Sequence, residues 1–194
     1  MKLRELFEEA TAQPGYYAVG DTHSALLANS SQNEWNNFSE KNASASGGSI
    51  VSKLEGIPPG SVVAISAGLN DALHSLSSPE QIAGNINNII AHAKNKGLKP
   101  IYMLFPHGEN PRLANVRDVL KGSVNTKTID LAELPLSPNR LSLSKDGYMR
   151  VAKSIMSYIK PSIPTIAAKQ PQPQPTPDET AAETQRLMQQ NARA

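Results

Sequence analysis

Residues that could carry out chemistry follow the first apolar run of the chain. The run 16–19 ends at Gly20, and the sequence Asp-Thr-His-Ser follows directly. A strand that ends at glycine and is followed by hydroxyl and imidazole groups is typical of the edge of an active site. The sequence therefore places candidate catalytic groups, Thr22 and His23 among them, at the end of a first strand.

Four short apolar runs predict the strands that must position these groups. They are continuous rather than alternating, which is typical of parallel strands covered on both faces. The runs are 16–19, 61–67, 100–105 and 126–131. A further strand between 36 and 46 is only weakly indicated.

Helical patterns lie between the predicted strands. In 78–97, Ser78 is a candidate N-cap, isoleucines recur on one face, and Gly97 is a stop signal. The segments 110–122 and 145–160 follow the later strands in the same way. Alternating strands and helices predict a doubly wound α/β sandwich.

Polar residues gather at the carboxyl ends of the predicted strands, where ligands bind in such sheets. Three of the four histidines fall there, namely His23, His74 and His107, whereas His92 lies within a helix and is expected at the surface. Asp21 and Asp71 are expected to accept hydrogen bonds from backbone N–H groups of loops. His23 is expected to point away from Thr22.

A metal site is not predicted at this edge. The two aspartates and three histidines could cluster, but no HxxxH or comparable ligand spacing is present. The absence of cysteine excludes disulfides and thiolate metal sites. We therefore expect neither a metal nor a cofactor.

Four segments in order resemble the four conserved blocks of the SGNH (GDSL-type) hydrolases. They read AVGDTHS, NASASGG, ISAGLND and LSLSKDGY, within residues 15–160. The resemblance implies a flavodoxin-like, three-layer α/β/α fold with about five parallel strands. It also implies hydrolysis of esters without a cofactor, on lipids, acyl carbohydrates or O-acetylated polysaccharides.

The resemblance assigns roles to five positions. Thr22 stands at the position of the serine nucleophile. Gly47 and Asn70 stand where the family has donors of its oxyanion hole. Ser142 stands at the histidine position and Asn139 at the aspartate position.

These departures from the family pattern remove the proton shuttle. A threonine hydroxyl needs a base as serine does, and serine cannot be that base near neutral pH. The sequence therefore favours a catalytically degenerate domain, kept as a structural or binding module. An active esterase remains the alternative, with Thr22 as nucleophile and His107, oriented by Glu109, as a relocated base. A third hypothesis is a small-ligand or glycan binder that uses the vestigial pocket around Gly47 and Asn70.

Composition and the chain ends complete the prediction. A net charge of +2 over 194 residues does not indicate a nucleic-acid partner, and no apolar run is long enough to span a bilayer. Residues 1–14 form a predicted amphipathic helix with Leu3, Leu6 and Phe7 on one side, and no signal peptide is recognised. A cytoplasmic or virion-associated location is expected.

The C-terminal part differs in composition from the predicted domain 15–160. Six of the fifteen prolines lie in 161–178, which predicts an extended Pro/Gln-rich linker. Residues 179–194 are expected to be a short helix or tail. The tail or the N-terminal helix is expected to bind protein partners in a larger assembly, for which a bacteriophage virion is one setting by analogy.

Overall fold

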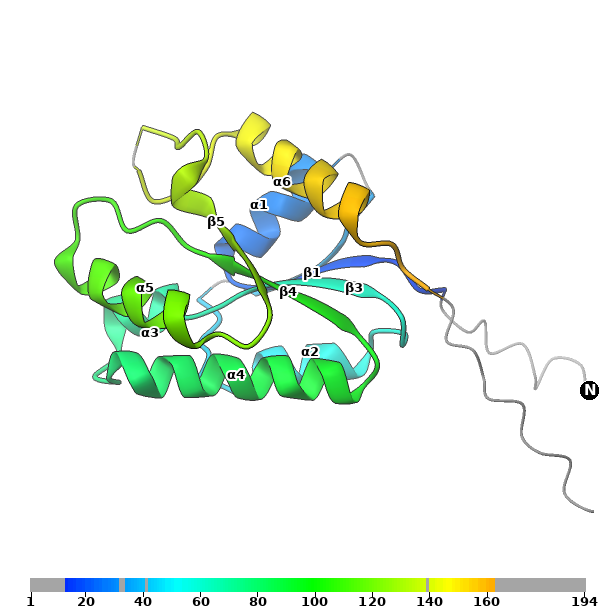
Figure 1. Cartoon of the computed structure of the whole chain (residues 1–194), viewed down its shortest axis with the longest axis horizontal. Coiled ribbons are helices and arrows are strands. Elements are labelled where there is room, and N and C mark those ends of the chain that lie inside the picture. Colours follow the sequence, from blue (N-terminus) through cyan, green and yellow to red (C-terminus); the bar gives the residue numbers. More distant parts are fainter. Residues whose placement is uncertain (1–12, 32–33, 41, 139, 163–194) are drawn as a thin grey trace, which may run out of the picture. The chain divides into compact units, whose positions relative to one another are not determined.

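A five-stranded, fully parallel sheet forms the centre of the fold (Figure 1). The computed structural model describes residues 13–31, 34–40, 42–138 and 140–162. The strands lie in the order β2-β1-β3-β4-β5, and every neighbouring pair is parallel. They are β1 (Tyr16–Gly20), β2 (Asn36–Ser39), β3 (Val62–Ser66), β4 (Lys99–Leu104) and β5 (Lys127–Asp130). This sheet confirms the predicted fold class, including the weakly indicated second strand.

Helices cover both faces of the sheet. Figure 1 shows α1 and α6 on one face and α2, α3, α4 and α5 on the other. The α-helices are α1 (Thr22–Ser30), α2 (Ser49–Glu55), α3 (Leu69–His74), α4 (Pro79–Asn95), α5 (Pro111–Ser123) and α6 (Lys145–Tyr158), and a 3₁₀ turn, η2, spans Leu131–Glu133. The described residues therefore form the three-layer α/β/α sandwich that the sequence predicts.

The central strands are buried on both faces. Along β3, Val63 and Ile65 pack toward α4 and α5, whereas Val62 and Ala64 pack toward α1 and α6. All four side chains are fully buried. Continuous apolar runs are the consequence, because neither face of the strand contacts water.

Helix α4 begins and ends where the sequence predicts. The Ser78 side chain accepts a hydrogen bond from the Gln81 N–H, and the Gln81 side chain accepts one from the Ser78 N–H. This reciprocal capping satisfies two donors that the first helical turn leaves open. Gly97 takes a positive φ of 72° just beyond the helix, a conformation that glycine adopts without steric cost.

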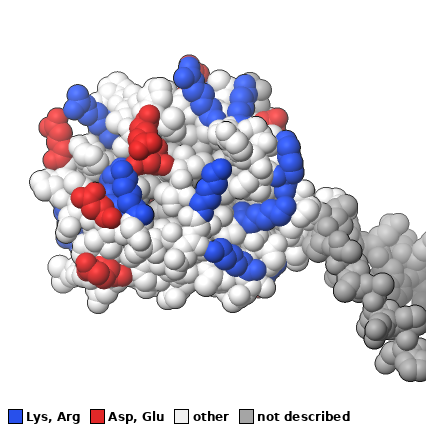
Figure 2. Space-filling view, viewed as in Figure 1, with Lys and Arg blue, Asp and Glu red and all other residues white. Residues whose placement is uncertain are grey.

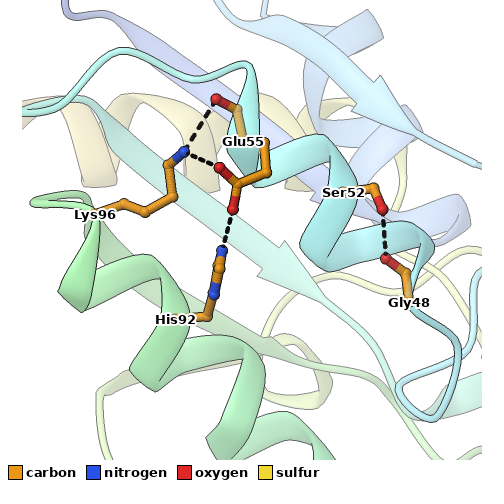
Figure 3. A network of polar contacts seen from close by, with 5 residues as sticks. All are labelled: Gly48, Ser52, Glu55, His92 and Lys96. Carbon is orange, nitrogen blue, oxygen red and sulfur yellow. Dashed lines mark hydrogen bonds and ion pairs between the residues drawn. The ribbon is translucent and has the colours of Figure 1, made fainter.

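Helices α2 and α4 are linked by an ion-pair network at their surface (Figure 3). The Glu55 carboxylate lies 2.7 Å from His92 Nε2 and 2.6 Å from Lys96 Nζ. These hydrogen bonds hold the pKa of Glu55 below its usual value. His92 is thus a partly exposed surface residue, as expected, and its imidazole contacts Glu55 at a distance from the candidate site.

Several sequence predictions concern residues outside the described part of the chain. They are the N-terminal helix up to residue 12, the linker and tail from residue 163 onward, and Asn139. Among the residues that are described, no helix has the length and apolar character needed to cross a membrane.

Candidate functional site

The candidate site begins at a turn that only glycine can form. Gly20 ends β1 with a φ of 125°, and a Cβ there would lie 1.8 Å from the carbonyl oxygen of Ser66. The next residue, Asp21, donates its N–H to that same oxygen at 3.0 Å. Because β1 and β3 are neighbours at this point, the turn presents Thr22 at the carboxyl edge of the sheet.

Thr22 is the first residue of α1 and is exposed. Asp21 caps the helix, since its carboxylate accepts the His23 N–H at 3.0 Å. Within the described residues, neither the hydroxyl nor the backbone N–H of Thr22 forms a hydrogen bond. The nucleophile position is therefore accessible, and no described group is placed to accept its proton.

His23 is buried, unlike its exposed neighbour Thr22. Its Nδ1 lies 2.5 Å from the Tyr148 hydroxyl, and its side chain is buried with 2% of the residue exposed. Burial lowers the pKa of the imidazole, an effect that the nearby Asp21 carboxylate partly offsets. Among the described residues, its Nε2 has no hydrogen-bond partner. His23 is thus a neutral, structural histidine in this arrangement.

Asp71 holds the loop of the second block in place. Its buried carboxylate accepts hydrogen bonds from the Ser44 hydroxyl at 2.5 Å, the Ala45 N–H at 2.8 Å and the Ser46 hydroxyl at 3.2 Å. A carboxylate that receives three donors fixes a loop strongly, because each charge-assisted bond is stronger than a neutral one. This agrees with the loop-stabilising role that the sequence indicates.

The two candidate oxyanion donors are engaged within the protein. The Gly47 N–H donates to the carbonyl oxygen of Ser44 at 3.3 Å, which closes a turn. The Asn70 side-chain amide donates to the carbonyl oxygen of Asn42 at 3.1 Å. An oxyanion hole requires donors aimed at the reacting oxygen. One N–H of the Asn70 amide remains for a ligand.

Ser142, at the histidine position, lies in a closed loop before α6. Its hydroxyl is 2.8 Å from the Ser137 hydroxyl, and its carbonyl oxygen accepts the Ser137 N–H at 2.8 Å. A β-bridge between Leu136 and Leu143 closes the base of the loop. The position therefore contributes to loop structure through Ser137, a partner that the sequence pattern did not indicate.

His107 follows β4 and lines a cavity of about 490 Å³. Residues from α3, from the start of α5 and from the loop before α6 complete its walls, with Leu73, Leu113 and Leu141 as its apolar side chains. Glu109, expected to orient His107, instead pairs with Arg140 at 3.3 Å. No hydrogen bond joins the His107 imidazole to any described residue, and Thr22, Gly47 and Asn70 do not line this cavity.

The carboxylates and imidazoles at this edge do not converge on a common point. Among the described residues, no group of three or more histidine, aspartate or glutamate side chains is arranged to hold a metal ion. Asp21, His23 and Asp71 instead bind neighbouring protein groups.

Tyr148 is a site residue that sequence reasoning did not single out. It belongs to the Gly-Tyr pair of the fourth block, and a Cβ at Gly147 would lie 2.9 Å from the Leu143 Cβ. The glycine therefore lets α6 approach the preceding loop, which brings Tyr148 to His23. A buried tyrosine needs a polar partner, and this general rule was the available signal.

The comparisons with known proteins concern the fold. No family model matches the sequence, and no curated protein matches it. Solved structures do match: the chain has the fold of the SGNH (GDSL-type) hydrolases.

Three solved structures illustrate the likeness. A GDSL-family lipolytic protein from Desulfitobacterium hafniense aligns at 19% identity over 73% of this chain and 97% of its own, with a TM-score of 0.53. An acylhydrolase from Bacteroides fragilis aligns at 14% identity over 76% and 89%, with a TM-score of 0.57. The OSK domain of Drosophila Oskar aligns at 16% identity over 78% and 95%, with a TM-score of 0.52. At these identities the likeness concerns the fold.

Proposed function

We propose that this domain is a catalytically degenerate SGNH-type fold that acts as a structural or binding module in a larger assembly. The observation that carries the proposal is at Thr22, whose hydroxyl has no hydrogen bond to a described imidazole or carboxylate. A serine, cysteine or threonine nucleophile depends on such a base to accept its proton. Without one, only binding and oxyanion stabilisation remain.

The engagement of the neighbouring groups supports the same proposal. His23 is committed to Tyr148 and His92 to Glu55, so two imidazoles serve structure. Gly47 donates its N–H within a turn, and Ser142 contacts Ser137. The contacts of His23, Gly47 and Ser142 stabilise the edge of the sheet in a form that lacks a proton shuttle, and His92 lies away from that edge.

The composition of the chain after the domain is the reason for proposing a larger assembly. Residues 161–178 are rich in proline and glutamine, and residues 179–194 follow with few apolar positions. Pro-rich linkers act as semi-rigid spacers, and segments with few apolar residues commonly gain structure on binding a partner. A bacteriophage virion is the setting we favour, by analogy with the many SGNH-like domains that phage genomes carry.

A comparison of the unchanged protein with Thr22→Ala tests the degenerate site. We expect hydrolysis of p-nitrophenyl acetate by the two proteins to be equal and at the level of buffer. Thr22 is exposed, so its replacement should leave the fold intact, which circular dichroism checks. Turnover that depends on Thr22 would contradict the proposal.

The alternative is an active esterase with Thr22 as nucleophile and His107 as base. Its support is the place of His107 shortly after β4, at the carboxyl edge of the sheet, whereas Thr22 does not line the cavity beside His107. In that case His107→Ala would abolish turnover as fully as Thr22→Ala, because members of a catalytic unit act together. A third hypothesis is the binding of a small ligand or glycan in the pocket around Gly47 and Asn70, which do not line the cavity beside His107. Binding of an acetylated sugar that survives His107→Ala but not Asn70→Ala would favour that hypothesis.

A further inference from the structure

One face of the sheet is incompletely covered next to its edge strand. Helices α1 and α6 are the two described α-helices on that face, and apolar residues of α6 belong to the same buried cluster as residues of β3 and β4. Packed helices lie about 10 Å apart, whereas strands are about 4.8 Å apart, so two helices cover about four strands. The fifth strand, β5, is left half-exposed, with Ile129 only partly buried.

An apolar groove of about 400 Å³ lies at this place, between β5 and α6. Ile101 and Ile129 of the sheet form one side, and Ile155 and Tyr158 of α6 belong to the other. Tyr158 is 74% exposed, and its ring is a large apolar surface in contact with water. The groove therefore has the composition of a site that another segment covers.

The charges at the groove are basic. Lys127 and Arg150 line it, and among the described lining residues none is acidic. The Lys127 ammonium lies 4.5 Å from the centre of the Tyr158 ring, and neither base forms an ion pair with a described carboxylate. Figure 2 shows Lys and Arg side chains predominating on the side of the molecule where α6 ends. An occupant with apolar and acidic groups would complement this surface.

The first twelve residues of the sequence have such a composition. They contain Leu3, Leu6 and Phe7 at helical spacing, and three glutamates, at 5, 8 and 9, against two basic residues, at 2 and 4. The strand that follows in the sequence, β1, begins near the end of α6, since the Tyr16 hydroxyl donates to the Ile159 carbonyl oxygen at 3.1 Å. Ile159 itself lines the groove.

The dimensions agree with this occupant. The part of α6 that lines the groove runs from Arg150 to Ile159, about 14 Å at 1.5 Å per residue. A helix of twelve residues is about 18 Å long. Residues 1–12 are therefore long enough to cover the groove and leave a short connection to β1.

We propose that residues 1–12 lie in the groove between β5 and α6 of the same chain, with Leu3, Leu6 and Phe7 against its apolar side and the glutamates near Lys127 and Arg150. The N-terminal segment then completes the helical layer that α1 and α6 leave open. It is part of the domain, and the partner-binding role falls to the C-terminal tail.

Cysteine crosslinking tests this placement directly, because the chain has no cysteine of its own. The double variant Leu6→Cys/Ser154→Cys places one thiol on the segment and one on exposed Ser154 in the groove. A short bismaleimide should join them within one chain at high yield. The matched control, Leu6→Cys/Asp118→Cys, places the second thiol on exposed α5 across the sheet and should give little product.

A second double variant is needed because Leu6→Cys removes one of the apolar side chains that the proposal places in the groove. Ala10→Cys/Ser154→Cys leaves Leu3, Leu6 and Phe7 intact and should crosslink in the same way. Charge reversal by Lys127→Glu/Arg150→Glu should lower the yield several-fold, whereas Lys145→Glu at the other end of α6 should not. Equal yields from the groove and control pairs would overturn the proposal. Products that join two chains would overturn it as well, and would assign the groove to a second copy.

Discussion

The His23 imidazole and the Tyr148 hydroxyl form a buried hydrogen bond, with 2.5 Å between Nδ1 and the oxygen. The two residues are 125 positions apart and belong to α1 and α6. The bond therefore ties the first block of the SGNH-type pattern to the last one beneath the edge of the sheet. The histidine next to the nucleophile position serves the fold.

Loss of this hydrogen bond should destabilise the domain. Tyr148→Phe leaves the ring in place but removes the partner of a buried Nδ1, which costs about 1–3 kcal/mol of unfolding free energy. Urea denaturation should show a lower midpoint with an unchanged slope. Tyr158→Phe is the matched control, because Tyr158 is exposed and should tolerate the same change. Equal midpoints for the two variants would contradict the structural role of Tyr148.

The stability of the domain should fall as the pH drops below 6.5. His23 has its pKa lowered by burial from 6.5, so the unfolded state binds a proton in a range where the folded state does not. Stability is then fully present above pH 6.5 and is lost progressively as the pH falls from 6.5 toward the lowered pKa of the folded state. The pKa values of Glu55 and Asp130 are also lowered, from ordinary values of 4.5 and 3.8. The stability that these two carboxylates contribute is therefore lost at a lower pH than the contribution of His23.

The variant His23→Gln isolates this contribution. It keeps a polar side chain beside Tyr148 but does not titrate, so its unfolding free energy should vary less between pH 7 and about pH 5. Urea titrations at several pH values measure the slope in each protein. Parallel slopes would show that His23 does not titrate differently in the two states.

Removal of the Asp71 carboxylate should release the loop of the second block. Asp71→Ala deletes the acceptor for Ser44, Ala45 and Ser46, at a cost of about 3 kcal/mol for charge-assisted bonds in a buried place. The hydrogen-exchange rate of the Ala45 amide should rise far more than the rates of the backbone amides of β3. Asp118→Ala, on exposed α5, should change stability by less than about 0.5 kcal/mol. Unchanged exchange at Ala45 would contradict this role of Asp71.

The sequence predicted the sheet well because parallel buried strands carry a simple signal. β1, β3 and β4 are buried on both faces, so each is a continuous apolar run. β2 has the sequence Asn-Asn-Phe-Ser and is partly exposed at the edge of the sheet, so periodicity indicates it only weakly. Its position follows from pairing with β1, a long-range contact that no local pattern records.

The local setting of the candidate residues was more predictable from the sequence than their contacts. The block pattern located Thr22, Gly47 and Asn70 at turns and helix starts. The direction of the Gly47 N–H toward Ser44 depends on backbone angles, which residue types do not determine. The pairing of Glu109 with Arg140 depends on two loops that meet only in the fold. Such tertiary choices explain why the expected Glu109–His107 pair is not found.

Restoration of the family residues tests the assigned positions of the site. The combined variant Thr22→Ser/Asn139→Asp/Ser142→His supplies the nucleophile, the histidine base and the carboxylate that orients it. We expect about tenfold or more hydrolysis of p-nitrophenyl acetate above Thr22→Ala. The activity should stay well below that of a complete site, because Gly47 donates elsewhere and one missing oxyanion donor costs about 10²–10³ in rate. Each single restoration should remain at background, since triad members act as a unit. A folded combined variant without activity would contradict the assignment of Asn139 to the aspartate position and of Ser142 to the histidine position.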